Sequence, residues 1–391
     1  MLDPTYTNAL TRLNAFVPKA GYEYAAQRNY DRPGHHNVSA LSPFLRHRII
    51  TEDEVLTATL RRHSARAAEK FIQEVYWRTY WKGWLEMRPT IWAQYQIDLK
   101  AALNRVQTES GLRADWDAAC SGDTGIDCFD HWAQELVATG YLHNHARMWF
   151  ASIWIFTLRL PWVLGADFFL RHLLDGDPAS NTLSWRWVGG IQTMGKTYLA
   201  RPDNIAKFTD GRFRPTGLAT YAAPLASPPH PAPAPLPSTE PFPKDRAIGL
   251  LLTEEDLSPG WLLDAVSPKA TAVLQATTSR SPLHIAPNVQ DFVSQALRNT
   301  HQRYGERLGA VKTTADLVSW AQNARIDHIV TSFAPVGPTA AALAQQRERL
   351  AAAGITLSQH QRRYDQQAWP FARAGFFKFK AAIPKLLPEL T

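Results

Sequence analysis

The sequence predicts a multi-domain protein in which a mostly helical domain is followed by a small, doubly wound α/β domain with a parallel sheet. A chain of 391 residues, 45% of them hydrophobic, exceeds the size at which single cores stop growing. Nine of the 22 residues in 222–243 are proline, a composition typical of an extended spacer. The apolar periodicity also changes across this spacer. We therefore expect domains at 1–221 and 244–391, joined by the linker 222–243.

The region before the linker has a helical pattern. Apolar residues recur at spacings of three and four through 54–84, 129–137, 145–158 and 167–174. Alternating β-branched residues are scarce, and eleven of the fourteen tryptophans lie in this region. These observations predict an all-helical domain of about 220 residues.

The region after the linker alternates between two patterns. Short apolar runs lie at 247–252, 272–276, 328–333 and 355–358, and amphipathic stretches lie at 289–304, 314–323 and 339–353. Gly354 stands where the last of these helices should end. Alternation of strand and helix implies right-handed crossovers, which predicts a parallel sheet.

Composition excludes several classes of protein. Two cysteines, Cys120 and Cys128, cannot build a disulfide scaffold or a four-thiolate metal centre, and we expect no metal. The formal charge of +7 is spread over both halves, so phosphate binding is allowed but not required. The N-terminus lacks the apolar core of a secretory signal, and the apolar run 149–158 is too short to span a bilayer. We expect a soluble, cytoplasmic monomer.

The segment 190–197 matches the phosphate-loop pattern G-x-x-x-x-G-K-T. A phosphate loop has to leave a buried strand and begin a long helix, but this segment follows a polar stretch and is soon followed by Pro202. We therefore interpret it as an ordinary turn.

Three segments of the helical region combine polar and aromatic side chains. They are Asp175-Gly-Asp177 through Trp187, the stretch 139–148 with Asn144, Arg147 and Met148 on one helix face, and Glu74 with Trp77, Arg78 and Trp81 at helical spacing. Each has a purely structural interpretation. Acids cap helices, indoles fill cores, and Glu74 can be either a buried carboxyl with a raised pKa or a surface ion pair.

Together these segments resemble the FAD-binding domain of the DNA photolyase and cryptochrome family. The resemblance runs from about Thr11 to Arg212 in matching order and spacing. It is carried by YAAQR at 24–28, SALSPFLR at 39–46, EVYWR at 74–78, Thr124-Gly125, His143-Asn144 and the block 175–187.

The resemblance implies a set of FAD-binding residues, namely Tyr24, Ser39, Leu41, Ser42, Arg78, Arg147, Asp175, Asp177 and Asn181. Hydroxyls and amides at a helix start suit the diphosphate. The position of Val38 is usually threonine in the family. By the resemblance, Arg147 and Asp175 pair beside the flavin ring and Asn181 faces its N5 atom, where an amide favours repair.

The resemblance also implies an electron path and a lesion pocket. Trp185 and Trp162 match the inner two members of the family's tryptophan chain. The third has no counterpart at the expected spacing, so Trp116, Trp132, Trp149 and Trp154 stay open as candidates.

For a flipped pyrimidine dimer, Trp77, Met148 and Trp187 would form the wall, and Glu74 and Asn144 would contact the polar edges. Arg28 and His145 would face DNA. His145 replaces an arginine, and the stretch 198–204 departs from the family's motif.

The C-terminal region resembles the family's antenna domain at 247–259 and at WPFARAGFFKF, 369–379. That domain normally comes first, so the chain would be circularly permuted. An antenna pigment of the folate or deazaflavin type is then conceivable.

We expect a light-driven, FAD-dependent lyase that repairs cyclobutane pyrimidine dimers in DNA. The alternative is a cryptochrome-like photoreceptor that binds FAD and signals to a protein partner. A light-independent flavoprotein would need an NAD(P)H site, which the sequence does not offer.

Overall fold

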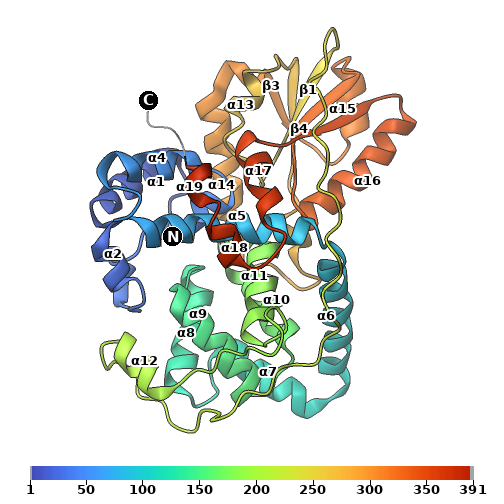
Figure 1. Ribbon diagram of the computed structural model, residues 1–391. Helices are drawn as coiled ribbons and strands as arrows, with labels where there is room; N and C mark the ends of the chain where they lie inside the picture. Colours follow the sequence, from blue (N-terminus) through green and yellow to red (C-terminus); the bar gives the residue numbers. More distant parts are fainter. Residues whose placement is uncertain (1, 388–391) are drawn as a thin grey trace.

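The computed structural model describes residues 2–387, which form a helical region and an α/β region (Figure 1). One cluster of buried apolar residues runs through both regions, and a second lies within the α/β region. The sheet lies on one side of α5 (Glu69–Glu86), and the helices from α7 (Ser110–Ser121) to α12 (Pro202–Phe208) lie on the other. The helices before the linker are α1 (Tyr6–Phe16), α2 (Tyr22–Gln27), α3 (Ser42–Arg46), α4 (Glu52–Arg62), α5 (Glu69–Glu86), α6 (Thr90–Thr108), α7 (Ser110–Ser121), α8 (Asp127–Thr139), α9 (Asn144–Ser152), α10 (Trp162–His172), α11 (Pro178–Val188) and α12 (Pro202–Phe208). This part confirms the predicted helical class.

The expected helical pattern over 54–84 is broken into two helices. Thr51 and Glu54 form a capping box that begins α4. The chain leaves the helix at His63, which is extended, and the Ser64 hydroxyl accepts a hydrogen bond from the Ala67 amide at 3.2 Å. Serine competes with helical hydrogen bonds in this way, so a turn separates α4 from α5.

The sheet has five parallel strands in the order β3-β2-β1-β4-β5. The strands are β1 (Ile248–Thr253), β2 (Ala270–Leu274), β3 (Ala310–Thr313), β4 (His328–Ser332) and β5 (Thr356–His360). Leu250 of β1 pairs with Thr271 on one side and Val330 on the other. The predicted doubly wound class is confirmed. β3 was not predicted, because it is a short, mostly exposed edge strand with no apolar run.

Helices follow the strands as expected of parallel crossovers. They are α13 (Gly260–Leu263), α14 (Pro287–Tyr304), α15 (Leu317–Asn323) and α16 (Pro338–Ala352), and after the sheet come α17 (Arg363–Ala368), α18 (Phe376–Lys380) and α19 (Ile383–Leu386). Gly354 follows α16 with a φ of 75°, the left-handed conformation that glycine adopts after a helix.

The C-terminal helices return to the helical region and pack on α5. The rings of Tyr76 and Tyr364 stack with centroids 5.8 Å apart, and the Tyr76 hydroxyl donates to the Leu386 carbonyl. The linker 222–243 has neither helix nor strand, and its Ala234 amide donates to the Met87 carbonyl. The domain boundaries at 221 and 244 stay a prediction.

The phosphate-loop match at 190–197 is a turn that follows α11 rather than a strand. Gly190 and Gly195 both have positive φ, which the turn requires. Within residues 2–387, no helix combines the length and apolar character that crossing a membrane would need.

Candidate functional site

Helices α5, α9 and α11 bring several of the predicted flavin residues together around the loop 175–177. Arg147 on α9 makes a two-pronged ion pair with Asp175, with nitrogen–oxygen distances of 3.1 and 3.0 Å. Arg78 on α5 lies 3.7 Å from the same carboxylate. Burial alone would raise the pKa of Asp175, but Arg147 and Arg78 hold it below its ordinary value. Asp175 is therefore a buried, ionised carboxylate.

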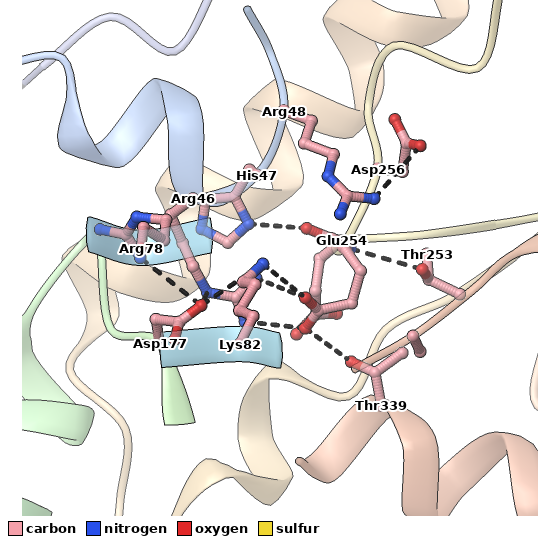
Figure 2. Close-up of polar contacts among 12 residues, drawn as sticks. Arg46, His47, Arg48, Arg78, Lys82, Asp177, Thr253, Glu254, Asp256 and Thr339 are labelled. Carbon is pink, nitrogen blue, oxygen red and sulfur yellow. Dashed lines mark hydrogen bonds and ion pairs between the residues drawn. The ribbon is translucent and has the colours of Figure 1, made fainter. Parts of the chain in front are cut away.

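Asp177 has both a structural and an electrostatic role. Its carboxylate caps α11 by accepting from the Ser180 amide at 2.7 Å. The same group lies 3.5 Å from Arg78 and 3.4 Å from Lys82 (Figure 2). Although burial opposes ionisation, Lys82, Arg78 and Arg46 hold the pKa of Asp177 well below its ordinary range. Asp177 therefore caps α11 and at the same time contributes a negative charge to the candidate flavin site.

Asn181 lies one turn into α11, and its amide has a fixed direction. The side-chain nitrogen donates to the Ala166 carbonyl at 2.8 Å, so the oxygen is the end that can accept from a partner. This is the orientation that an acceptor facing a protonated flavin N5 requires.

The predicted diphosphate residues lie at the start of α3. The Leu41 amide donates to the Ser39 hydroxyl at 3.4 Å, and Ser42 is the first residue of the helix. The Ser42 hydroxyl also helps to lower the pKa of Asp175. Tyr24 is buried on α2, with its ring edge against Phe71.

Two residues of the predicted lesion pocket already have partners. Glu74 forms an ion pair with Arg28, another predicted DNA-facing residue. Burial raises the pKa of Glu74 in spite of this arginine. Trp77 is stacked on Phe376 of α18, with ring centroids 3.5 Å apart and planes within 10°. Phe376 was not predicted, because it is 299 positions away in the sequence.

The other predicted lesion residues are more open. Asn144 is exposed at the first position of α9, and Met148 is half-buried one turn later. Trp187, also half-buried, packs against Tyr198 with ring centroids 5.6 Å apart.

The two departures from the family's DNA-facing pattern contact each other. His145 Nε2 lies 3.1 Å from the Tyr198 hydroxyl, and Nδ1 lies 2.9 Å from the Asn29 carbonyl. The imidazole ring is stacked on Trp149 at 4.0 Å. Burial lowers the pKa of His145, which keeps the ring neutral near pH 7. His145 therefore bridges three segments of the helical region instead of offering a charge to phosphate.

The indoles of the predicted electron path lie on packed helices. Trp185 on α11 meets Trp154 edge to face at 6.1 Å. Trp162 on α10 lies 5.8 Å from the ring of Tyr95 on α6, which in turn is 5.1 Å from Trp92. Tyr95 and Trp92 were not predicted, although their spacing of three on one helix was a readable signal.

The four candidates for the third tryptophan of the electron path have different neighbours. Trp154 contacts Trp185, whereas Trp132 and Trp149 stack on each other at 5.4 Å, next to His145. Trp116 lines a cavity of about 740 Å³ between α6, α7 and the segment 279–283.

Two of the residues that line this cavity carry buried polar atoms without a hydrogen-bond partner in the described part of the chain. The lining includes Tyr95, Trp92 and Arg280. The Arg280 side chain is buried, and none of its three guanidinium nitrogens has a hydrogen-bond partner within residues 2–387. The Tyr95 hydroxyl is also without one. Buried donors of this kind are uncommon in folded proteins, and they accommodate water or an anionic group.

Comparison with known proteins gives a consistent result for the helical region. A family model described as the FAD binding domain of DNA photolyase matches residues 71–214. The deoxyribodipyrimidine photo-lyase of a Thermus thermophilus strain is 31% identical over 189 residues, which are 48% of this chain and 43% of that protein. The enzyme of the same name from Agrobacterium fabrum is 33% identical over 190 residues, covering 48% and 38%.

Among solved structures, a bacterial class III photolyase from Agrobacterium tumefaciens matches with 28% identity and a TM-score of 0.43, covering 52% of this chain and 42% of that one. The chain thus spans about two fifths of the length of the curated relatives it matches.

Proposed function

Because the helical region of this chain belongs to the DNA photolyase and cryptochrome family, we propose that it holds FAD and uses light to repair cyclobutane pyrimidine dimers in DNA. The observation that carries the proposal is the set Arg147, Asp175 and Asn181. Arg147 and Asp175 form a two-pronged ion pair, and the Asn181 amide nitrogen is bound to the Ala166 carbonyl, which leaves the amide oxygen as the acceptor. Reduced FAD, when bound and excited by light, supplies the electron that opens the dimer.

The residues present fit an anionic flavin dinucleotide. Arg78 Nη1 is buried and has no hydrogen-bond partner within residues 2–387, although it lies 3.5 Å from Asp177. This donor can serve a folded cofactor. Ser39 and Ser42 offer hydroxyls next to the start of α3. In this proposal, the ionised Asp175 and Asp177 accept hydrogen bonds and keep Arg147 and Arg78 in place.

The lesion would bind against Trp77, Met148 and Trp187, with Glu74 and Asn144 at its polar edges. For Glu74 to contact the dimer, Arg28 has to release it, and DNA phosphate is a suitable new partner for that arginine. The raised pKa of Glu74 favours a carboxyl that donates a hydrogen bond to the dimer.

The test is repair of an oligonucleotide that carries one dimer. The protein, reduced under anaerobic conditions, is illuminated with blue light, and intact thymines are quantified. We expect light-dependent loss of the dimer. Loss in the dark, or no loss with fully reduced flavin present, would contradict the proposal.

A cryptochrome-like photoreceptor that signals to a protein partner is the second candidate. The observation that favours it is His145, which is neutral and already bonded to Tyr198 and Asn29. Binding to damaged and undamaged DNA across a salt series separates the candidates. Repair predicts a damage-specific component that survives at high salt, and equal binding favours the receptor.

We further propose that the C-terminal α/β region is the family's antenna domain in a permuted position, and that the cavity of Trp92, Tyr95 and Arg280 is the place for its pigment. Arg280 lines this cavity, its guanidinium has no hydrogen-bond partner within residues 2–387, and in this proposal it turns toward an acidic group of the pigment. An absorption band that remains after FAD is removed, and that Arg280→Met abolishes, is the expected result. Purified protein with flavin absorption alone would contradict this part.

A further inference from the structure

The carboxyl end of β1 in the sheet is covered by residues 46–48 of the helical region. In the strand order β3-β2-β1-β4-β5, the chain adds strands to one side of β1 and then, from β4, to its other side. Doubly wound folds commonly bind ligands in the crevice at the carboxyl ends of the two strands where the order switches, here β1 and β4. Here the residues that follow β1, Glu254 to Asp256, contact the basic residues 46–48 at the end of α3 (Figure 2). His47 contacts the Glu254 carbonyl and Arg48 lies 3.5 Å from Asp256.

Glu255 and Arg46 form the strongest of these contacts. Both Arg46 terminal nitrogens donate to the Glu255 carboxylate at 2.7 Å, and Arg46 Nε donates to the Gly176 carbonyl at 2.9 Å. Thr339 lies 3.3 Å from the same carboxylate. Burial opposes ionisation, but Arg46 and Lys82 lower the pKa of Glu255 to about 2. The carboxylate is therefore charged at neutral pH.

The same two cations also face the predicted flavin residue Asp177. Lys82 Nζ lies 3.4 Å from Asp177 and 3.9 Å from Glu255. Arg46 Nε lies 3.8 Å from Asp177. Lys82 and Arg46 are thus shared between one carboxylate of the helical region and one of the α/β region.

We propose that Glu255 is a positioning residue for the flavin site, which makes the α/β region a built-in part of that site. Glu255 binds Arg46 on the sheet side and lies 3.9 Å from Lys82, so that the two cations neutralise Asp177 from 3.8 and 3.4 Å without donating short hydrogen bonds to the oxygens that a cofactor needs. This inference rests on the proposed binding of FAD.

The consequence of losing the charge follows from these distances. In Glu255→Gln, Arg46 loses its bidentate carboxylate, and Asp177 becomes the nearest carboxylate for Arg46, as it already is for Lys82. They move onto Asp177 and compete with the cofactor for its oxygens. Loss of one charge-assisted hydrogen bond to FAD would raise its dissociation constant about 10-fold or more.

The experiment compares three variants of the full-length protein by fluorescence titration of the flavin-free form with FAD. Glu255→Gln keeps the shape and removes the charge, whereas Glu255→Asp keeps the charge and shortens the side chain. The matched control is Glu254→Gln, because Glu254 is the buried neighbour that bonds to Ala276 and Thr277 within its own region. Urea unfolding of each variant confirms that it is folded.

We expect Glu255→Gln to bind FAD about 10-fold more weakly, Glu255→Asp to bind more tightly than Glu255→Gln, and Glu254→Gln to bind like the wild type. Wild-type affinity in Glu255→Gln, or equal weakening in Glu254→Gln, would overturn the inference and leave the proposed function intact. A wild-type protein that takes up no FAD would overturn both.

Discussion

Replacing Arg46 by methionine should be among the most destabilising single changes in this chain. The Arg46 side chain is 2% exposed and donates to Glu255 twice and to Gly176 once. Methionine fills a similar volume but leaves the Glu255 carboxylate buried with the Thr339 hydroxyl at 3.3 Å and Lys82 at 3.9 Å. Removing one partner of a buried ion pair typically costs about 3 to 5 kcal/mol, and we expect a loss in that range for the free energy of unfolding.

Urea unfolding followed by circular dichroism measures this loss. Arg105→Met is the control, because Arg105 and Glu109 form an ion pair on the protein surface, and its loss should change stability very little. The double variant Arg46→Met with Glu255→Leu removes both charges, so it should be more stable than Arg46→Met alone. A loss below about 1 kcal/mol in Arg46→Met, or a double variant that is less stable than the single one, would refute the reasoning.

Three further predictions concern the core, a buried acid and the lesion pocket. Gly165→Ala would place a methyl group into the ring of Trp185, and we expect unfolding measurements to show a loss of about 1 to 3 kcal/mol; unchanged stability would mean that this contact is loose. Burial raises the pKa of Glu86 to about 7, so ionisation opposes folding as the pH rises from about 4.5 through 7. Glu86→Gln should therefore stabilise the protein at pH 8 and have a smaller effect at pH 5, and the opposite order in urea midpoints would contradict this. Glu74→Gln should slow repair in single-flash assays with unchanged flavin content, whereas loss of flavin would argue against its role at the lesion.

The fold class could be predicted because it depends on local pattern. The strands β1 and β2 are buried and mostly apolar, and β4 and β5 each overlap a short apolar stretch, Ile329–Val330 and Ile355–Leu357, that marks them in the sequence. β3 lacked this signal because edge strands need few buried side chains. The turn at 63–68 was missed because polar side chains at Ser64 decide it, not the apolar spacing.

The candidate site could be predicted only where its residues match a family motif. Arg147, Asp175 and Asn181 belong to such motifs, and the structure brings the first two into an ion pair. Arg46 and Glu255 are 209 positions apart, and either one alone reads as an ordinary surface charge in the sequence. The stacking of Phe376 on Trp77 depends in the same way on tertiary packing that periodicity does not encode.

The flavin content of the purified protein tests the central claim most directly. The absorption spectrum of the protein as isolated, or after refolding with FAD and removal of excess ligand, gives the ratio of flavin to chain. We predict about one FAD per chain with a structured band in the blue, and a large reduction in Arg147→Gln, which leaves Asp175 without its closest cation. A colourless protein that takes up no FAD while its circular dichroism shows the folded helical content would contradict the account.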